Sequence, residues 1–156
     1  MSRNKPLLIW PAVMVVFFLP TALANSEVIV PKEPIRLFNG KDLANFYTWL
    51  VDRGTSDPKR VFSVVEDIDG GPAIRISGEE WGGLITNRAY RDYKLLIELR
   101  WGLTTWGNRR GAARDSGILL HCQGADGNNR KDVNGPWMRS LETQVIEGGF
   151  GDFNHA

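Results

Sequence analysis

Residues 140–149 read "SLETQVIEGG", in which two glutamates and a glutamine stand among apolar residues. Successive side chains of a β-strand point to opposite faces of the sheet. A strand here places Leu141 and Val145 on one face. Glu142 and Gln144 lie on the opposite face. The stretch therefore predicts a strand that buries its apolar face and presents its polar face to a ligand.

Two more stretches show the same alternation. "YKLLIELRW" (residues 93–101) and "SGILLHCQG" (residues 116–124) each predict a strand with one apolar face and two polar groups on the other. If the three strands lie in one sheet, their polar faces bring together six side chains: Glu98, Arg100, His121, Gln123, Glu142 and Gln144. Such a face is either an ordinary solvated sheet surface or the floor of a binding site. The mixture of acid, base and amide favours the binding floor.

Further short apolar runs, bounded by Gly, Asn and Asp, extend the pattern over residues 60–67, 73–78 and 82–87. No stretch keeps a helical period for ten residues, although residues 41–50 allow a helical turn. Many short strands without alternating helices are typical of an antiparallel sandwich or jelly roll. The sequence therefore predicts an all-β fold of two antiparallel sheets.

The N-terminus predicts export. Arg3 and Lys5 precede an apolar run over residues 7–20, and the small residues Ala22 and Ala24 follow in the pattern of a signal-peptidase site. We therefore expect a signal peptide over residues 1–24, a linker over 25–34 and a β-sandwich domain over 35–156. The alternative is a membrane anchor formed by residues 7–24.

Composition limits the partners. Removal of the signal lowers the formal net charge from +1 to −1, which provides no basic surface for nucleic acid. Cys122 is the single cysteine, so no intrachain disulfide is possible. Cys122 lies on the same face of its predicted strand as apolar neighbours, which predicts a buried thiol.

Four motifs occur in a fixed order: "LFNGKDLANF" (residues 37–46), "GGLITNRAYRDYKLLIELRW" (82–101), "DSGILLHCQG" (115–124) and "SLETQVIEGGFGD" (140–152). Together they resemble the 3-keto-disaccharide hydrolase domain family. The departures are Tyr93 for Phe, Asp115 for Asn, Leu141 for an aromatic residue and Glu147 for Asp. The resemblance implies a concanavalin/laminin-G-like jelly roll. Members of the family continue for several strands beyond the fourth motif, so it also implies a jelly roll that is incomplete at its C-terminal end.

The resemblance implies a hydrolase or lyase that acts on sugars whose C3 hydroxyl is oxidised to a ketone. The ketone acidifies the C2 proton, so one base suffices to remove it, and a positive group stabilises the enolate. Glu142 and His121 are the candidate bases, and Arg100 or a divalent metal ion is the candidate positive group. His121 and Glu142 are also the possible metal ligands, although their spacing is not diagnostic. Structural roles are the alternative, with His121 in ordinary hydrogen bonds and Glu142 paired to Arg100.

A conventional two-carboxylate glycosidase fits less well. Retaining and inverting enzymes hold their carboxyl groups about 5 Å or roughly 6.5–9.5 Å apart. Glu142 and Glu147 are separated by about 16 Å in an extended strand and lie on opposite faces.

Tryptophans in loops are candidate sugar contacts, because the C–H face of a sugar ring stacks on indole. Trp81 and Trp137 lie in such loops and are either sugar platforms or packing residues. Glu98, Arg100, Gln123 and Gln144 complete the candidate substrate-binding set. Two rival functions stay open: a carbohydrate-binding module without catalysis, and an inactive truncated domain.

Overall fold

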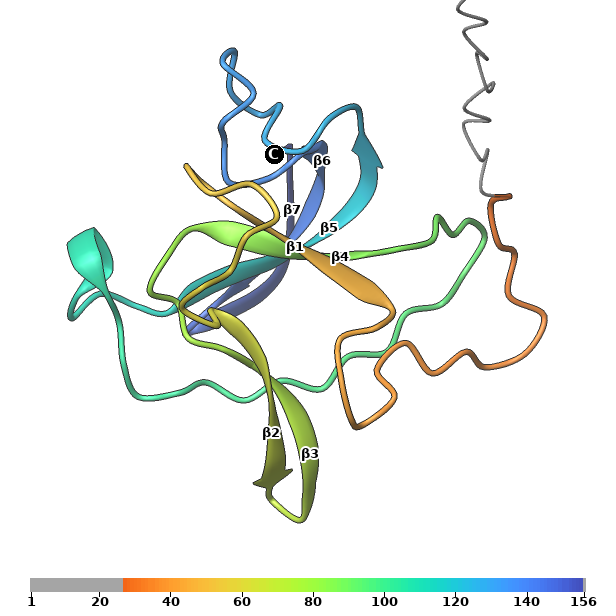
Figure 1. The fold of residues 1–156 in the computed structure, drawn as a ribbon, viewed down its shortest axis with the longest axis horizontal. Helices are drawn as coiled ribbons and strands as arrows, with labels where there is room; N and C mark the ends of the chain where they lie inside the picture. Colours follow the sequence, from red (N-terminus) through yellow and green to blue (C-terminus); the bar gives the residue numbers. More distant parts are fainter. Residues whose placement is uncertain (1–26, 156) are drawn as a thin grey trace, which may run out of the picture.

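The computed structural model describes residues 27–155, so the expected signal peptide lies outside the described residues. The chain in this range forms strands and one 3-10 turn (Figure 1). The elements are β1 (Phe46–Leu50), β2 (Phe62–Ile68), β3 (Gly71–Ile76), β4 (Gly82–Thr86), η1 (Gly107–Arg109), β5 (Asp115–Gln123), β6 (Arg139–Ile146) and β7 (Gly149–His155).

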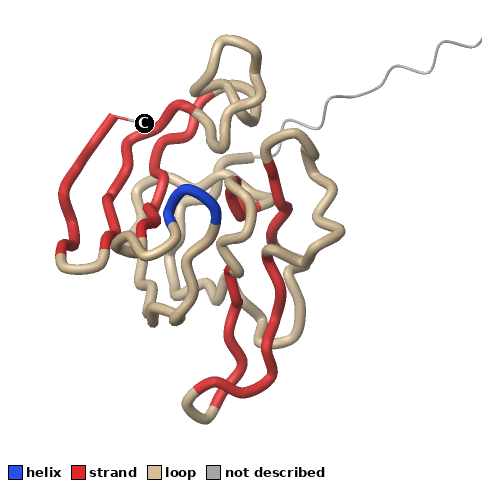
Figure 2. Tube along the Cα trace, turned by 90° about the vertical axis from the view of Figure 1, so that its left-hand side faces the viewer, coloured by secondary structure: helices blue, strands red, loops and turns tan. Residues whose placement is uncertain are grey.

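All strand pairs are antiparallel, which confirms the prediction of an all-β, jelly-roll-like fold. Within the described range the strands form three small sheets rather than two continuous ones: β1–β4, β2–β3 and β5–β6–β7. The β2–β3 hairpin lies between β1 and β4 in the sequence and projects away from the rest of the chain (Figure 1). Figure 2 shows the three strands of the C-terminal sheet side by side.

The main core lies where β1 and β2 meet. Leu50, Val61 and Phe62 are buried there, and Leu43 and Leu84 pack against them. The carboxylate of Asp57 accepts hydrogen bonds from the backbone N–H groups of Val61 at 2.8 Å and Phe62 at 2.9 Å. These bonds satisfy backbone donors that the core withdraws from water.

A glycine pair sets the distance between β1 and β4. Gly82 is paired with Leu50, and Gly83 with Trp49. A Cβ at Gly82 would overlap the backbone oxygen of Trp49 and lie 2.8 Å from Leu50 Cδ2. Only glycine fits at this position, where the start of β4 lies against the end of β1.

The prediction of a strand over residues 93–101 is wrong. This segment pairs with no strand of the described chain. The residues that we expected on a buried face are partly exposed, with Ile97 at 49% and Leu99 at 45%, and Leu96 is 82% exposed. An alternating sequence forms a stable strand only where a neighbour completes its hydrogen-bond ladder and covers its apolar face.

A β-bulge changes the face of β5 near its end. Leu119 is opposite Glu142 and Leu120 opposite Leu141, but the register then shifts so that Gln123 is opposite Arg139. His121 lies within the shift and has a φ of 54°. One extra residue in a strand reverses which side chains point to each face. Gln123 is therefore on the face of Leu141, opposite to the face that we predicted for it.

Candidate active site and aromatic pocket

The side chain of Glu142 extends from β6 across β5 at Gly117. A Cβ at Gly117 would lie 2.7 Å from both Cγ and Cδ of Glu142 and would overlap its carboxylate. The glycine leaves the space that the carboxylate fills. Gly117 is the third residue of "DSG" at the start of β5, and the position of the Glu142 carboxylate explains why it is a glycine.

A second carboxylate, Asp115, lies beside Glu142. The amide of Gln144 donates to Asp115 Oδ1 at 2.5 Å, as expected for two residues near each other in adjacent strands. Arg109 Nη2 lies 3.3 Å from Asp115 Oδ2 and also donates to the carbonyl oxygen of Ala113 at 2.6 Å. We call the four residues Glu142, Asp115, Gln144 and Arg109 the carboxylate site.

The environment of the carboxylate site raises the pKa of Glu142 above its ordinary value. Partial burial of the carboxyl group is the main cause, and the negative charge of Asp115 adds to it. No hydrogen bond or ion pair to the Glu142 carboxylate occurs among the residues whose side chains the structure describes. Glu142 therefore holds a proton more readily than a free glutamate does.

Glu147 shows the opposite behaviour. The Arg114 guanidinium donates to Glu147 Oε2 at 2.9 Å, and this contact holds the pKa of Glu147 below its ordinary value. Two glutamates close together in the sequence thus have environments that shift their pKa values in opposite directions. Such a difference is typical of a functional carboxylate beside a structural one.

Four of the predicted side chains lie elsewhere. Arg100 donates to both oxygens of Asp69 at 2.6 Å in the β2–β3 turn, so the pair with Glu142 that we gave as a structural alternative is not observed. Glu98 is exposed in the segment that does not form a strand. His121 is exposed at the bulge and makes no side-chain hydrogen bond to the described residues, and Gln123 faces away from Glu142. Of the six-residue polar face, Glu142 and Gln144 come together.

A divalent metal stays a prediction. Among the residues whose side chains the structure describes, neither His121 nor Glu142 belongs to a group of three or more His, Cys, Asp or Glu side chains able to hold an ion.

Trp81 and Trp137, predicted independently as sugar contacts, do come together. Their ring centroids are 6.3 Å apart, and the ring planes meet at 61°. Both line a cavity of about 290 Å³, which we call the aromatic pocket; its other lining residues are Val51, Asn108, Arg130 and Pro136. Trp81 is 48% exposed, so its ring is available to a ligand.

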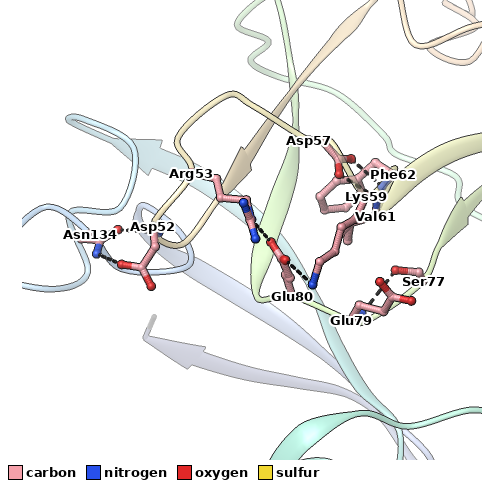
Figure 3. A network of polar contacts seen from close by, with 10 residues as sticks. All are labelled: Asp52, Arg53, Asp57, Lys59, Val61, Phe62, Ser77, Glu79, Glu80 and Asn134. Atoms are coloured by element: carbon pink, nitrogen blue, oxygen red, sulfur yellow. Dashed lines mark hydrogen bonds and ion pairs between the residues drawn. The ribbon is translucent and has the colours of Figure 1, made fainter.

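Ion pairs hold the loop that carries Trp81 (Figure 3). The preceding residue, Glu80, accepts from Arg53 Nε at 2.7 Å and lies 2.8 Å from Lys59 Nζ. Asp52 and Asn134 exchange two hydrogen bonds, at 2.6 and 2.9 Å, and so join the end of β1 to the loop before β6 (Figure 3).

The loop before β6 carries the other wall of the aromatic pocket and is fixed to β1. Trp49 Nε1 donates to the carbonyl oxygen of Gly135 at 2.9 Å, and the Tyr47 hydroxyl donates to Asp126 at 3.0 Å. Buried Gly135 and Pro136 then place Trp137 at the pocket.

The 3-10 turn η1 joins the two sites. Asn108 lines the aromatic pocket, while its neighbour Arg109 contacts Asp115 of the carboxylate site. Trp106 anchors the turn by donating from Nε1 to the carbonyl oxygen of Ser77 at 2.9 Å. A ligand in the pocket therefore lies against Asn108, the residue that directly precedes Arg109 of the carboxylate site.

Sequence reasoning missed Asp115, Arg109 and Arg130. Asp115 was noted only as a replacement for Asn, and the two arginines lie outside every strand that we predicted from the sequence. The sequence contains a signal for Asp115, because period-two alternation puts it on the same face of β5 as Gly117 and Leu119. No periodic pattern covers the loops of Arg109 and Arg130.

Comparison with known proteins identifies the family. The model of the 3-keto-alpha-glucoside-1,2-lyase-like domain matches residues 33–156, so the chain belongs to that family. The predicted resemblance is thereby confirmed. No curated protein and no solved structure matches the chain. In the described part of the chain, no helix is long and apolar enough to span a lipid bilayer.

Proposed function

We propose that this protein cleaves the glycosidic bond of 3-keto-glycosides by elimination, with Glu142 as the base. The observation that carries the proposal is the Glu142 carboxylate, which lies over Gly117 beside Asp115, partly withdrawn from water and without an ion pair among the described residues. Membership of the 3-keto-alpha-glucoside-1,2-lyase-like domain family supports the substrate class.

The chemistry needs one base. The C3 ketone acidifies the hydrogen on C2, and the Glu142 carboxylate removes this proton to leave an enolate. The enolate expels the glycosidic oxygen from C1, and this oxygen takes up the proton held by Glu142, which gives an unsaturated keto sugar and the released alcohol and restores the carboxylate. Addition of water to the double bond completes a net hydrolysis. A general base works best when its pKa is near the working pH, and the raised pKa of Glu142 supports this role.

Arg109 is the positive group that we assign to the enolate. Its guanidinium lies beside Asp115 through an ion pair, and it is the charged partner that the structure brings to the carboxylate site. An arginine fixed before the reaction stabilises developing negative charge without reorganising. Arg100, the arginine expected from the sequence, is instead bonded to Asp69.

The direct test is product release. The purified protein is incubated with a 3-keto disaccharide and with the same disaccharide unoxidised, and the free sugar is followed by mass spectrometry. We expect release from the 3-keto substrate alone, because only the ketone acidifies C2. Release from both substrates at equal rates would contradict the elimination mechanism.

The rival function is a carbohydrate-binding module, and the pair of tryptophans in the aromatic pocket supports it. Trp81→Ala and Trp137→Ala each remove one face of the aromatic pocket, and loss of a stacking ring weakens sugar affinity about tenfold. Trp101→Phe outside the pocket is the matched control. For a catalytic protein, the alanine variants raise KM for the 3-keto substrate. Sugar binding that needs the tryptophans, with no turnover by the unaltered protein, would establish the binding module instead.

We propose export as the context of this activity, on the apolar run over residues 7–20 and the small residues Ala22 and Ala24. The N-terminal sequence of the protein recovered from its host is the test. A start at Asn25 supports a cleaved signal, whereas retention of residues 7–24 in the membrane fraction supports the anchor.

A further inference from the structure

Among the described residues, Arg130 is the single charged residue that lines the aromatic pocket. Its backbone is held in the loop before β6, where its N–H donates to Gly127 at 3.2 Å and its carbonyl oxygen accepts from Val133 at 3.1 Å. Its side chain makes no ion pair with any acidic residue of the described chain. The guanidinium therefore remains available to a ligand.

The other lining residues define what such a ligand must offer. Trp81 and Trp137 supply aromatic faces, and Val51 and Pro136 supply apolar contacts. Asn108 supplies an amide that can both donate and accept hydrogen bonds. No carboxylate of the described part of the chain lines the pocket to neutralise Arg130. The combination fits a ring with apolar C–H faces, hydroxyl groups and one negative charge.

Size agrees with this ligand class. The cavity of about 290 Å³ lies at the lower end of the range for small-molecule sites, which suits one sugar ring rather than a longer chain. A guanidinium donates two parallel hydrogen bonds to a carboxylate or to a sulfate, and this geometry makes the contact selective as well as strong.

We propose that the aromatic pocket binds a sugar ring that carries an anionic group, a carboxylate or a sulfate, with Arg130 as the residue that selects the charge. The inference rests on the proposed function in one respect, that the ligand is a sugar. It adds the substrate class: glycosides with an acidic ring at the position that occupies the pocket.

The test is isothermal titration calorimetry on the full chain at low salt with three ligands: methyl glucoside, methyl glucuronide and glucose 6-sulfate. We expect at least one anionic ligand to bind about tenfold more tightly than the neutral one, the size typical of one charge-assisted contact. The arm that shows this gain identifies the carboxylate or the sulfate. Arg130→Gln removes the gain of the anionic over the neutral ligand. Arg110→Gln, the same change at an exposed arginine outside the pocket, keeps the gain.

Three results would overturn the proposal: equal affinity for all three ligands, no binding of any of them, or equal losses in the two arginine variants. The last result would show a general effect of net charge. None of the three affects the proposed function, because release of sugar from a 3-keto disaccharide is measured separately with a neutral substrate. Conversely, an anionic preference that persists in a protein without turnover would retain the pocket and reject the enzyme.

Discussion

Glu142→Gln is expected to reduce turnover of a 3-keto disaccharide by about 10²–10⁴-fold, the usual contribution of a positioned general base. The amide keeps the shape of the side chain over Gly117 but does not accept the C2 proton. The folded state should not suffer, because no ion pair to Glu142 among the described residues is lost. Turnover close to that of the unaltered protein would remove Glu142 from the mechanism.

The pH dependence of stability gives an independent readout. The pKa of Glu142 is raised from its ordinary value of 4.5, so the folded chain favours the protonated form. The protonated Glu142 carboxyl group contributes favourably to the free energy of unfolding. This contribution is complete below pH 4.5 and is lost as the pH rises through the raised pKa. At neutral pH the carboxylate is therefore unfavourable, and Glu142→Gln should unfold at an equal or higher temperature.

Glu147→Gln is the matched control. The pKa of Glu147 is lowered by Arg114, so its contribution is present above pH 4.5 and is lost as the pH falls through the lowered value. This variant should lose stability at neutral pH, keep its turnover and resemble the unaltered protein in acid. Thermal unfolding of both variants across pH 3–8 separates the two glutamates. Parallel profiles would contradict the opposite environments described above.

Gly117→Ala should reduce turnover about 10²-fold, because the added methyl group occupies the place of the Glu142 carboxylate and displaces it from its position. The displaced atoms are the end of a flexible side chain, so the fold should be retained. Far-UV circular dichroism and kcat measured together provide the test. We expect the loss in kcat rather than in KM, since the aromatic pocket is untouched.

Gly71→Ala provides the control for Gly117→Ala. Gly71 also lies in a strand, and a Cβ there meets no atom within 4 Å. Turnover should be unchanged. Equal losses in the two variants would show that any alanine in a strand impairs the protein, and the specific role of Gly117 would then fall.

The fold was predictable where the sequence pattern is local. Period-two alternation identified β5 and β6, and short runs with glycine turns identified the β2–β3 hairpin and β4. The same pattern was wrong over residues 93–101, because alternation describes a single segment and says nothing about whether another strand lies beside it. Leu96, 82% exposed, shows the consequence.

The candidate site was predictable in part for a related reason. Glu142 and Gln144 share a face by parity within β6, and the structure keeps them together beside Asp115. Gln123 was misplaced by the bulge at His121, since one inserted residue reverses parity without any mark in composition. Arg109 and Arg130 reach their sites through loops, whose paths depend on tertiary contacts such as the bond from Trp49 to Gly135.

Ligand binding in the aromatic pocket should also stabilise the folded state. Trp81 comes from the loop before β4, whereas Arg130 and Trp137 come from the loop before β6, so a bound sugar connects the β1–β4 pair to the C-terminal sheet. The unfolded chain has no such pocket. A ligand at a hundred times its Kd therefore adds about 2.7 kcal/mol to the free energy of unfolding. A rise in melting temperature can thus rank candidate sugars even when none of them is turned over.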